Sequence, residues 1–150
     1  MSDVYLAAIF TIIGGVVVFV LSEMIKEIWL SPLQKYKSLK HDISYKLAYY
    51  ARYYTEVMDP ADNSGNLYKK YNEAADDLHS LACELKGFIE TLSWFKPLIP
   101  SRIALSKASE QIMGLSNGFF CGYNANTSSE HSEHNETRAR KIKCLLKLTD

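Results

Sequence analysis

The sequence predicts an all-α protein, with an N-terminal transmembrane helix followed by a small cytoplasmic helical bundle. Residues 4–21 contain no charged side chain and nothing more polar than one threonine and one tyrosine. After residue 30, apolar residues recur at spacings of three and four through several long segments, which is the period of an amphipathic helix. No segment alternates apolar and polar residues with a period of two, so no β-strand is predicted.

Composition limits the chain to one small domain in addition to the membrane segment. The predicted span leaves about 120 residues, which is enough for a modest hydrophobic core. Seventeen basic and seventeen acidic side chains balance, so the net charge indicates no polyanionic partner. The three cysteines are widely spaced and form no CxxC pair. This pattern argues against a disulfide framework and suits a reducing compartment.

The N-terminal segment is long enough to cross a bilayer. The stretch Val4–Leu21 would extend about 27 Å as a helix, close to the ~30 Å thickness of the hydrocarbon core. A helix is required there, because lipid offers no hydrogen-bond partners to the backbone. A cleaved secretory signal is the alternative, but the first residues carry Asp3 and no basic side chain, and no small-x-small pattern precedes Glu23. We therefore expect residues 1–30 to anchor the chain in a membrane.

Charge and side-chain size refine this prediction. The residues before the span carry no lysine or arginine, whereas the residues after it carry many. The positive-inside rule then places the N-terminus outside and the C-terminal domain in the cytoplasm. Small residues recur every four positions at Ala7, Thr11 and Gly15, on one helix face where two backbones can approach closely. We predict that this face packs two spans of a homo-oligomer, although small residues are also common in spans that do not associate.

A proline-containing motif marks the predicted start of the helical bundle. Ser31 is expected to be an N-cap, Pro32 to occupy the first helical position, and Gln34 to complete a capping box. Apolar residues recur at helical spacing from Leu33 onwards. This helix is expected to end near Met58, before a loop rich in aspartate, serine and glycine.

Three further helices are predicted, separated by segments rich in proline, glycine and polar residues. The predicted helices span about residues 66–92, 102–117 and 135–148, with Ser101 as a cap and Asn117-Gly118 as a stop signal. Residues 122–134 are polar and are predicted to be a loop. The bundle is thus expected to occupy residues 31–121, and the polar loop and basic C-terminal helix residues 122–150. That helix is compatible with solvent, anionic lipid or a nucleic-acid backbone.

The residue types needed for catalysis or metal binding form no recognisable motif. There is no phosphate-binding glycine loop, nucleophile elbow or HExxH sequence. His131 and His134 lie beside Glu130 and Glu133, but in a serine- and asparagine-rich segment that offers no scaffold to orient metal ligands. No arginine is followed four to six residues later by histidine, the pattern of helical ribonucleases of the HEPN type. We therefore expect no enzyme activity, metal, cofactor or small-molecule substrate.

Tyrosine and arginine form a second surface on the helix that follows Pro32. Five of the ten tyrosines fall between Tyr45 and Tyr54. Tyr49, Arg52 and Tyr53 are predicted to share a face distinct from the apolar stripe and to form a protomer contact, because both residue types are favoured at interfaces. Alternatively, this helix is central and covered on both sides. Stacking on single-stranded nucleic acid would use the same residue types, but the acidic neighbouring helix argues against it.

Several short motifs resemble a widespread group of small bacterial single-span membrane proteins. The motifs are Ile13–Leu21, Trp29–Gln34, the tyrosine-rich Leu47–Ala51, Ile99–Arg102 and Gly114–Asn117. The resemblance extends over about residues 13–117 and leaves the histidine-rich loop and the tail unmatched. The general build of this group is similar to that of accessory effectors in anti-phage modules, such as retron transmembrane effectors and CRISPR-associated membrane pore proteins.

The resemblance implies an inner-membrane effector of an anti-phage, abortive-infection module that oligomerises and perturbs the membrane. It also implies a reverse transcriptase or a CRISPR effector ribonucleoprotein as a partner, in addition to the lipid bilayer and further copies of the chain. The alternative is a membrane-tethered adaptor that recruits a cytoplasmic partner through its helical domain. A tethered helical nuclease ranks last, because its motif is missing.

Overall fold

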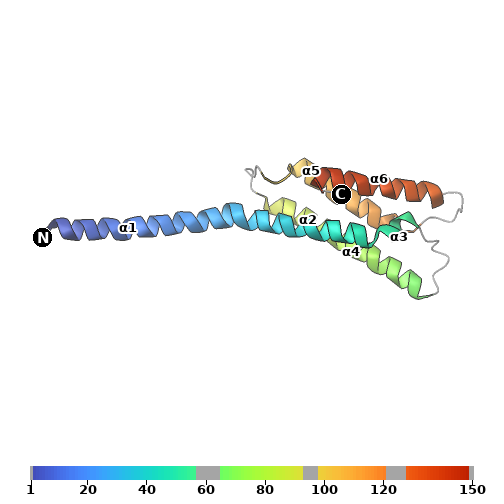
Figure 1. Ribbon diagram of the computed structural model, residues 1–150, viewed down its shortest axis with the longest axis horizontal. Coiled ribbons are helices and arrows are strands. Elements are labelled where there is room, and N and C mark those ends of the chain that lie inside the picture. Colours follow the sequence, from blue (N-terminus) through green and yellow to red (C-terminus); the bar gives the residue numbers. More distant parts are fainter. Residues whose placement is uncertain (1, 57–64, 93–97, 121–127, 149–150) are drawn as a thin grey trace. The chain divides into compact units, whose positions relative to one another are not determined.

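The structure is a computed structural model that describes residues 2–56, 65–92, 98–120 and 128–148. Every element in these ranges is a helix, which confirms the all-α prediction (Figure 1). The chain divides into two compact units, residues 1–35 and 36–150.

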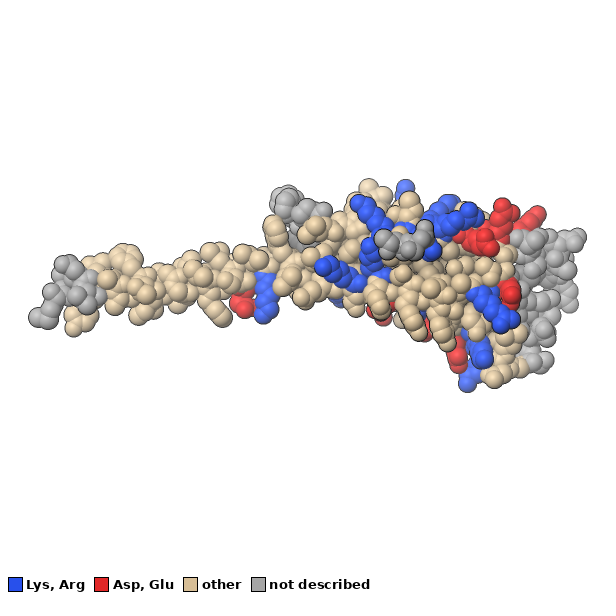
Figure 2. All heavy atoms as spheres, viewed as in Figure 1, with Lys and Arg blue, Asp and Glu red and all other residues tan. Residues whose placement is uncertain are grey.

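The first unit is a long apolar helix. Helix α1 covers Ser2–Ile25, a short π-helix η1 covers Lys26–Leu30, and α2 begins at Ser31. Among the described residues one helix, Tyr5–Tyr49, is long and apolar enough to cross a membrane. Figure 2 shows a continuous tan surface along most of α1, since no charged side chain lies between Tyr5 and Ser22.

The predicted helix break at Ser31 is wrong. Ser31 has helical angles, φ −59° and ψ −49°, and its N–H donates to the Lys26 carbonyl five residues earlier. Pro32 has no N–H, and in a regular α-helix its ring would clash with the carbonyl of Ile28. One wider turn relieves this conflict, so the helix continues through the proline instead of ending before it.

The second unit is an antiparallel helical bundle. It contains the rest of α2 (Ser31–Tyr49), the short α3 (Ala51–Thr55), and the long helices α4 (Asn66–Thr91), α5 (Arg102–Asn117) and α6 (Ser128–Leu146). Helix α5 packs between α4 and α6, and α3 packs on α6 (Figure 1). The fully buried side chains include Ile43, Leu47, Leu78, Leu85, Phe88, Leu105, Ile112, Leu115, Phe119, Ile142 and Leu146. Most of the predicted apolar stripes therefore form the core, but Leu67 and Ile103, which were predicted to face inward, are 55% and 70% exposed because each lies in the first turn of its helix.

The antiparallel order gives the bundle two ends, which we name after one residue of each. At the Tyr36 end, the Tyr36 ring lies 6.3 Å from the Phe88 ring, and Arg102 Nη2 donates to the Ile89 carbonyl at 2.9 Å. At the Asn135 end, the Asn135 amide joins α6 to α3 and to the turn after α5. The two predicted signals that bound α5 are confirmed, because Ser101 Oγ accepts from the Ala104 N–H at 3.2 Å and the helix stops at Asn117.

Helix α2 ends earlier than predicted. The helix was expected to reach Met58, which lies outside the described residues, but Tyr50 leaves the helical region with φ −94° and ψ 11°. This break allows the Tyr54 side chain to be buried, with its hydroxyl donating to the Leu47 carbonyl in the last turn of α2 at 3.2 Å. It also brings the Tyr50 hydroxyl to Asp77 on α4.

Helix α6 begins earlier than predicted. Residues 128–134 are helical and not a polar loop, while residues 122–127 lie outside the described residues. The polar side chains of this helix have partners on other elements. Ser132 Oγ donates to the Thr55 carbonyl at 2.7 Å, and Asn135 Nδ2 donates to the carbonyls of Tyr54 and Gly118 at 3.3 and 2.6 Å.

The C-terminus of α6 is closed by a pair of backbone hydrogen bonds. The N–H of Leu148 donates to the Lys143 carbonyl at 2.9 Å, and the N–H of Lys147 donates to the Cys144 carbonyl at 3.2 Å. This is the Schellman pattern, which usually has glycine at its left-handed position. Here Lys147 occupies that position, with φ 52°.

Two glycine substitutions test the packing at the Asn135 end. A Cβ on Gly118 would lie 2.1 Å from Asn135 Oδ1, so Gly118→Ala must displace the amide from both of its carbonyls. We expect a loss of about 2 kcal/mol in the free energy of unfolding. Gly87→Ala is the matched control: it has nothing within 4 Å and should stabilise α4 by about 0.5–1 kcal/mol. Thermal unfolding of the full chain in detergent, followed by circular dichroism, would contradict this account if the two variants shift in the same direction.

Candidate functional site

A chain of tyrosine rings runs from the surface of α2 to the core side of α4. The ring centroids of Tyr45 and Tyr49 lie 5.8 Å apart, those of Tyr49 and Tyr50 lie 5.0 Å apart, and those of Tyr50 and Tyr53 lie 5.9 Å apart. Tyr53 then meets Tyr71 edge-on at 4.8 Å. Such aromatic pairs stabilise a fold beyond the area that they bury. This tyrosine chain therefore holds the end of α2 and the short α3 against α4.

Only one end of the tyrosine chain faces solvent. Tyr45 and Tyr49 are 58% and 63% exposed, whereas Tyr50 and Tyr53 are half-buried and Tyr71 is buried. Of the predicted protomer-contact residues, Tyr49 has an exposed ring, whereas the ring of Tyr53 packs against those of Tyr50 and Tyr71. The aromatic surface that this chain of rings leaves open to a partner is therefore the Tyr45–Tyr49 pair.

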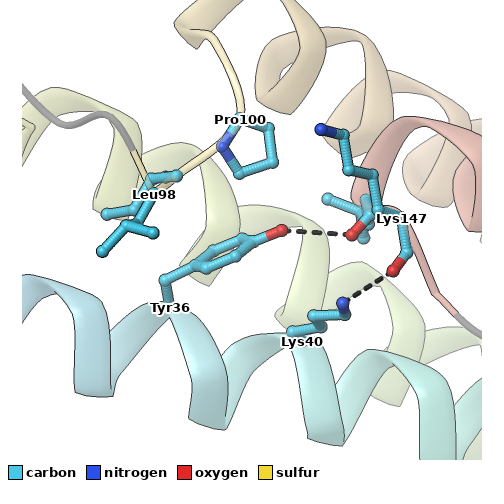
Figure 3. Close-up of a pocket in the computed structure, with 7 residues that line it drawn as sticks. Tyr36, Lys40, Leu98, Pro100 and Lys147 are labelled. Carbon is cyan, nitrogen blue, oxygen red and sulfur yellow. Dashed lines mark hydrogen bonds between the residues drawn. The ribbon is translucent and has the colours of Figure 1, made fainter.

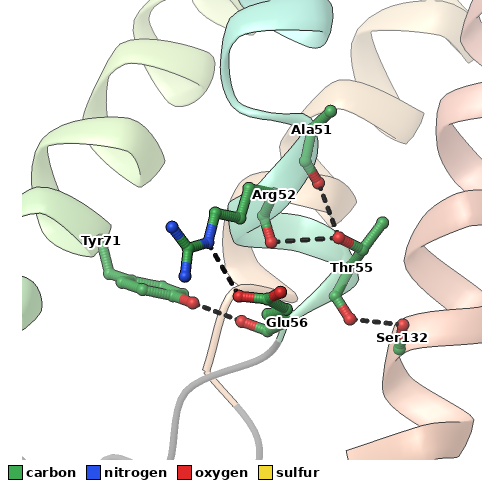
Figure 4. Close-up of polar contacts among 6 residues, drawn as sticks. All are labelled: Ala51, Arg52, Thr55, Glu56, Tyr71 and Ser132. Carbon is green, nitrogen blue, oxygen red and sulfur yellow. Dashed lines mark hydrogen bonds and ion pairs between the residues drawn. The ribbon is translucent and has the colours of Figure 1, made fainter.

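Arg52, the third predicted contact residue, is exposed but already paired. Its Nε lies 2.9 Å from Glu56 Oε2, and the Tyr71 hydroxyl donates to the Glu56 carbonyl (Figure 4). The hydrogen bond to Glu56 is the main cause that raises the pKa of the Arg52 guanidinium. Thr55 donates to the Ala51 carbonyl at 3.1 Å on the same short helix. Arg52 thus already has a partner within its own chain, Glu56, at the end of α3.

A partly exposed ion pair between α2 and α4 holds the middle of the tyrosine chain. Lys46 Nζ lies 2.6 Å from Asp77 Oδ2, and the Tyr50 hydroxyl donates to the same oxygen. Burial raises the pKa of the Asp77 carboxyl, but the hydrogen bonds from Lys46 and Tyr50 and the Lys46 charge outweigh burial, so its pKa lies below the usual 3.8. Burial and the bond to Asp77 raise the pKa of Tyr50 far above its usual value. The sequence offered no signal for this pairing, because Asp77 and Tyr50 lie 27 residues apart.

The predicted helix-packing residues lie on α1. All three side chains are exposed, and the Thr11 hydroxyl donates to the Ala7 carbonyl at 2.9 Å. Nothing lies within 4 Å of a Cβ placed on Gly15. Their spacing of four puts them on one face of the helix, and the satisfied hydroxyl of Thr11 is compatible with apolar surroundings.

Metal-ligating residue types are dispersed in the described part of the chain. No three His, Cys, Asp or Glu side chains there are grouped as a metal site. His131 is half-buried and His134 exposed, both near the start of α6. The strongest candidate features are therefore surfaces: the exposed helix α1 and the outer end of the tyrosine chain.

The Asp77 pair predicts a pH dependence with a definite sign. Because the folded pKa of Asp77 is lowered, the unfolded state binds more protons at acid pH, and the contribution of Asp77 is complete above the unfolded pKa of about 3.9. It is lost as the pH falls through the folded pKa. Asp77→Asn should cost about 0.5–1 kcal/mol at neutral pH and flatten this part of the acid dependence. Unfolding in detergent from neutral pH to pH 3 measures both effects. Asp76→Asn, at the exposed neighbouring position, is the control, and an equal acid slope in all three proteins would contradict the assignment.

Known proteins were compared with this chain by sequence and by structure. No protein-family model, curated protein or solved structure matches it.

Proposed function

We propose that this protein is a single-span inner-membrane effector that self-associates and perturbs the membrane. The observation that carries the proposal is the exposure of α1. Its large apolar side chains, from Tyr5 to Ile25, are 49–69% exposed, and none of them is buried among the described residues. An apolar surface of this extent is compatible with lipid and not with water.

The dimensions and energies of α1 fit a bilayer. A helix of 24 residues extends about 36 Å, which covers the ~30 Å hydrocarbon core with some tilt. Val4–Leu21 holds twelve valine, leucine, isoleucine and phenylalanine residues, whose insertion together contributes about 4–7 kcal/mol. The backbone hydrogen bonds are satisfied within the helix, as lipid requires.

The charges after α1 support an orientation with the bundle in the cytoplasm. Four lysines, at positions 26, 35, 37 and 40, follow the apolar stretch, whereas Glu23 and Glu27 are the only acidic residues between positions 22 and 40. Lysine near the end of a span is retained on the cytoplasmic side. The N-terminus is then outside and residues 36–150 are inside.

The effector role combines the span with the motif resemblance. A single helix encloses no pore, so an action on the membrane requires several copies. The face of Ala7, Thr11 and Gly15 is where we place the contact between spans, because small residues permit close helix packing in lipid. The general build of the small single-span proteins that the motifs resemble is similar to that of anti-phage accessory effectors, which favours a role in abortive infection with a reverse transcriptase or a CRISPR effector ribonucleoprotein as the trigger.

Membrane insertion and topology can be tested directly. The full-length chain should remain with bacterial membranes after carbonate extraction and should keep its full length. A reporter that is active only in the periplasm should work at the N-terminus and fail at the C-terminus. Release by carbonate, or a shortened product in the periplasm, would instead indicate a peripheral protein or a cleaved signal.

The packing face can be tested against its opposite face. The triple substitution Ala7→Leu, Thr11→Leu and Gly15→Leu should abolish crosslinked oligomers and relieve toxicity, because bulky side chains separate the backbones. The control is Ile9→Leu, Ile13→Leu and Val17→Leu, which lies about 200° away around the helix and should behave like the wild type. Growth, a potential-sensitive dye and crosslinking in cells measure the outcome. Normal growth and membrane potential on overexpression of the wild type, with and without phage, would reject the effector role.

A membrane-tethered adaptor is the second candidate, favoured by the exposed Tyr45–Tyr49 pair on a bundle that has its own core. An adaptor needs the span only as a tether. Replacing residues 4–21 by an unrelated apolar span should then preserve function, whereas Tyr45→Ser with Tyr49→Ser should abolish it. The effector proposal expects the span replacement to abolish function, because it places the contact between copies in the span, so the span replacement separates the two candidates.

A further inference from the structure

A small pocket at the Tyr36 end of the bundle is built around the last carbonyls of α6. It encloses about 130 Å³ and is lined by Tyr36, Lys40, Leu98, Ile99, Pro100, Leu146 and Lys147. The Tyr36 hydroxyl donates to the Leu146 carbonyl at 3.2 Å and Lys40 Nζ donates to the Lys147 carbonyl at 2.6 Å (Figure 3). The two hydrogen bonds satisfy carbonyls that a helix end leaves open, and the ammonium group of Lys40 suits the negative end of the α6 dipole.

Two large aliphatic side chains in this part of the chain are exposed: Leu98, in the wall of the pocket, and Ile103, in the first turn of α5. Leu98 is 75% exposed and Ile103 is 70% exposed, more than any other large apolar residue among those described. Both are held by buried neighbours, since Ile99 is 8% exposed and Leu105 is fully buried. The segment therefore presents Leu98 and Ile103 outward from a backbone that is anchored by buried neighbours.

Basic side chains accompany these aliphatic residues. Lys40 and Lys147 line the pocket, and Arg102 precedes Ile103. Arg102 Nη2 lies 3.9 Å from Glu90 Oε2, so Glu90 offsets one positive charge at this end. The remaining excess is positive. Surfaces that bind anionic lipid combine aliphatic residues with lysine. The aliphatic side chains enter the membrane interface and the lysine ammonium groups bind lipid phosphates.

The covalent chain limits how far this end can be from the bilayer. Tyr36, in the wall of the pocket, follows the last residue of α1, Ile25, by eleven residues. Eleven residues span about 40 Å at most, so the chain keeps this end of the bundle within reach of the headgroups. The Asn135 end has no such tether, because its residues lie far along the chain from the span.

We propose that the Tyr36 end of the bundle docks on the anionic phospholipid surface, with Leu98 and Ile103 in the interface and Lys40 and Lys147 at lipid phosphates. This inference rests on the proposed membrane span and adds a second contact with the same leaflet. The pocket wall brings Lys40 and Lys147 together with the exposed Leu98, and Ile103 follows Pro100 by three residues, which favours a lipid surface over a free phosphate ion.

Spin-label accessibility tests the docking in the full-length protein. Single cysteines at Leu98→Cys, Ile103→Cys, Leu67→Cys and Val17→Cys are introduced after the three native cysteines are changed to serine. The proteins are placed in nanodiscs of phosphatidylcholine with phosphatidylglycerol. Leu67 is the matched control, because it is 55% exposed in the first turn of α4, at the Asn135 end. The ratio of accessibility to oxygen over a water-soluble nickel complex should be severalfold higher at positions 98 and 103 than at position 67.

The outcomes separate this inference from the proposed function. Equal ratios at positions 98, 103 and 67, together with an immersed label at position 17, would overturn the docking and leave the span intact. An aqueous label at position 17 would overturn both. Lys40→Gln with Lys147→Gln should lower the ratio at position 98 to its value in pure phosphatidylcholine, while Lys69→Gln with Lys70→Gln should leave it unchanged. Glutamine keeps a donor for the Lys147 carbonyl, so a ratio that stays high in the first pair would reject the role of anionic lipid.

Discussion

The bundle depends on one buried amide, the side chain of Asn135. It is 1% exposed, and its Nδ2 donates to a carbonyl at the end of α3 and to another in the turn after α5. A buried amide of this kind is stabilising only when its partners are in place, because an unsatisfied polar group in a core costs about 1–3 kcal/mol. Gly118 is required for the same reason, since any side chain there would occupy the place of the Asn135 oxygen. The contact fixes the register of α6 on α5 and closes the end of the bundle where α3 lies.

Local signals in the sequence predicted the helices whose ends are determined locally. The limits of α4 and α5 agree with prediction within a residue. For α5 the reason is that Ser101 and Gly118 act on their own helix. The predictions failed where a distant partner decides. The break of α2 at Tyr50 brings the Tyr50 hydroxyl to Asp77, 27 residues away. The polar start of α6 is helical, and its Ser132 and Asn135 side chains donate to carbonyls of other elements. The prediction of a break at Ser31-Pro32 was wrong for a different reason, since a π turn accommodates the proline, which has no N–H, without ending the helix.

The candidate sites divide in the same way. The positions of Ala7, Thr11 and Gly15 on one face follow from helix geometry alone. The fates of Tyr49, Arg52 and Tyr53 depend on the break at Tyr50, which no spacing rule shows. Tyr53 turns toward α4, Arg52 pairs with Glu56, and Tyr49 remains outward. The exposed aliphatic residues near Pro100 are a second case, because only the packing of Ile99 and Leu105 determines that Leu98 and Ile103 face away.

Lys147 is a residue with a side chain at a position where glycine would be more stable. Left-handed backbone costs a residue with a side chain about 1–2 kcal/mol, and glycine is the common solution at the end of a helix. A more stable variant is thus one substitution away, yet it would lack the cation beside the pocket. Natural proteins keep such locally unfavourable residues where activity benefits from them. Under the docking proposed above, the end of α6 is a position where a glycine that stabilises the fold would remove a contact with lipid.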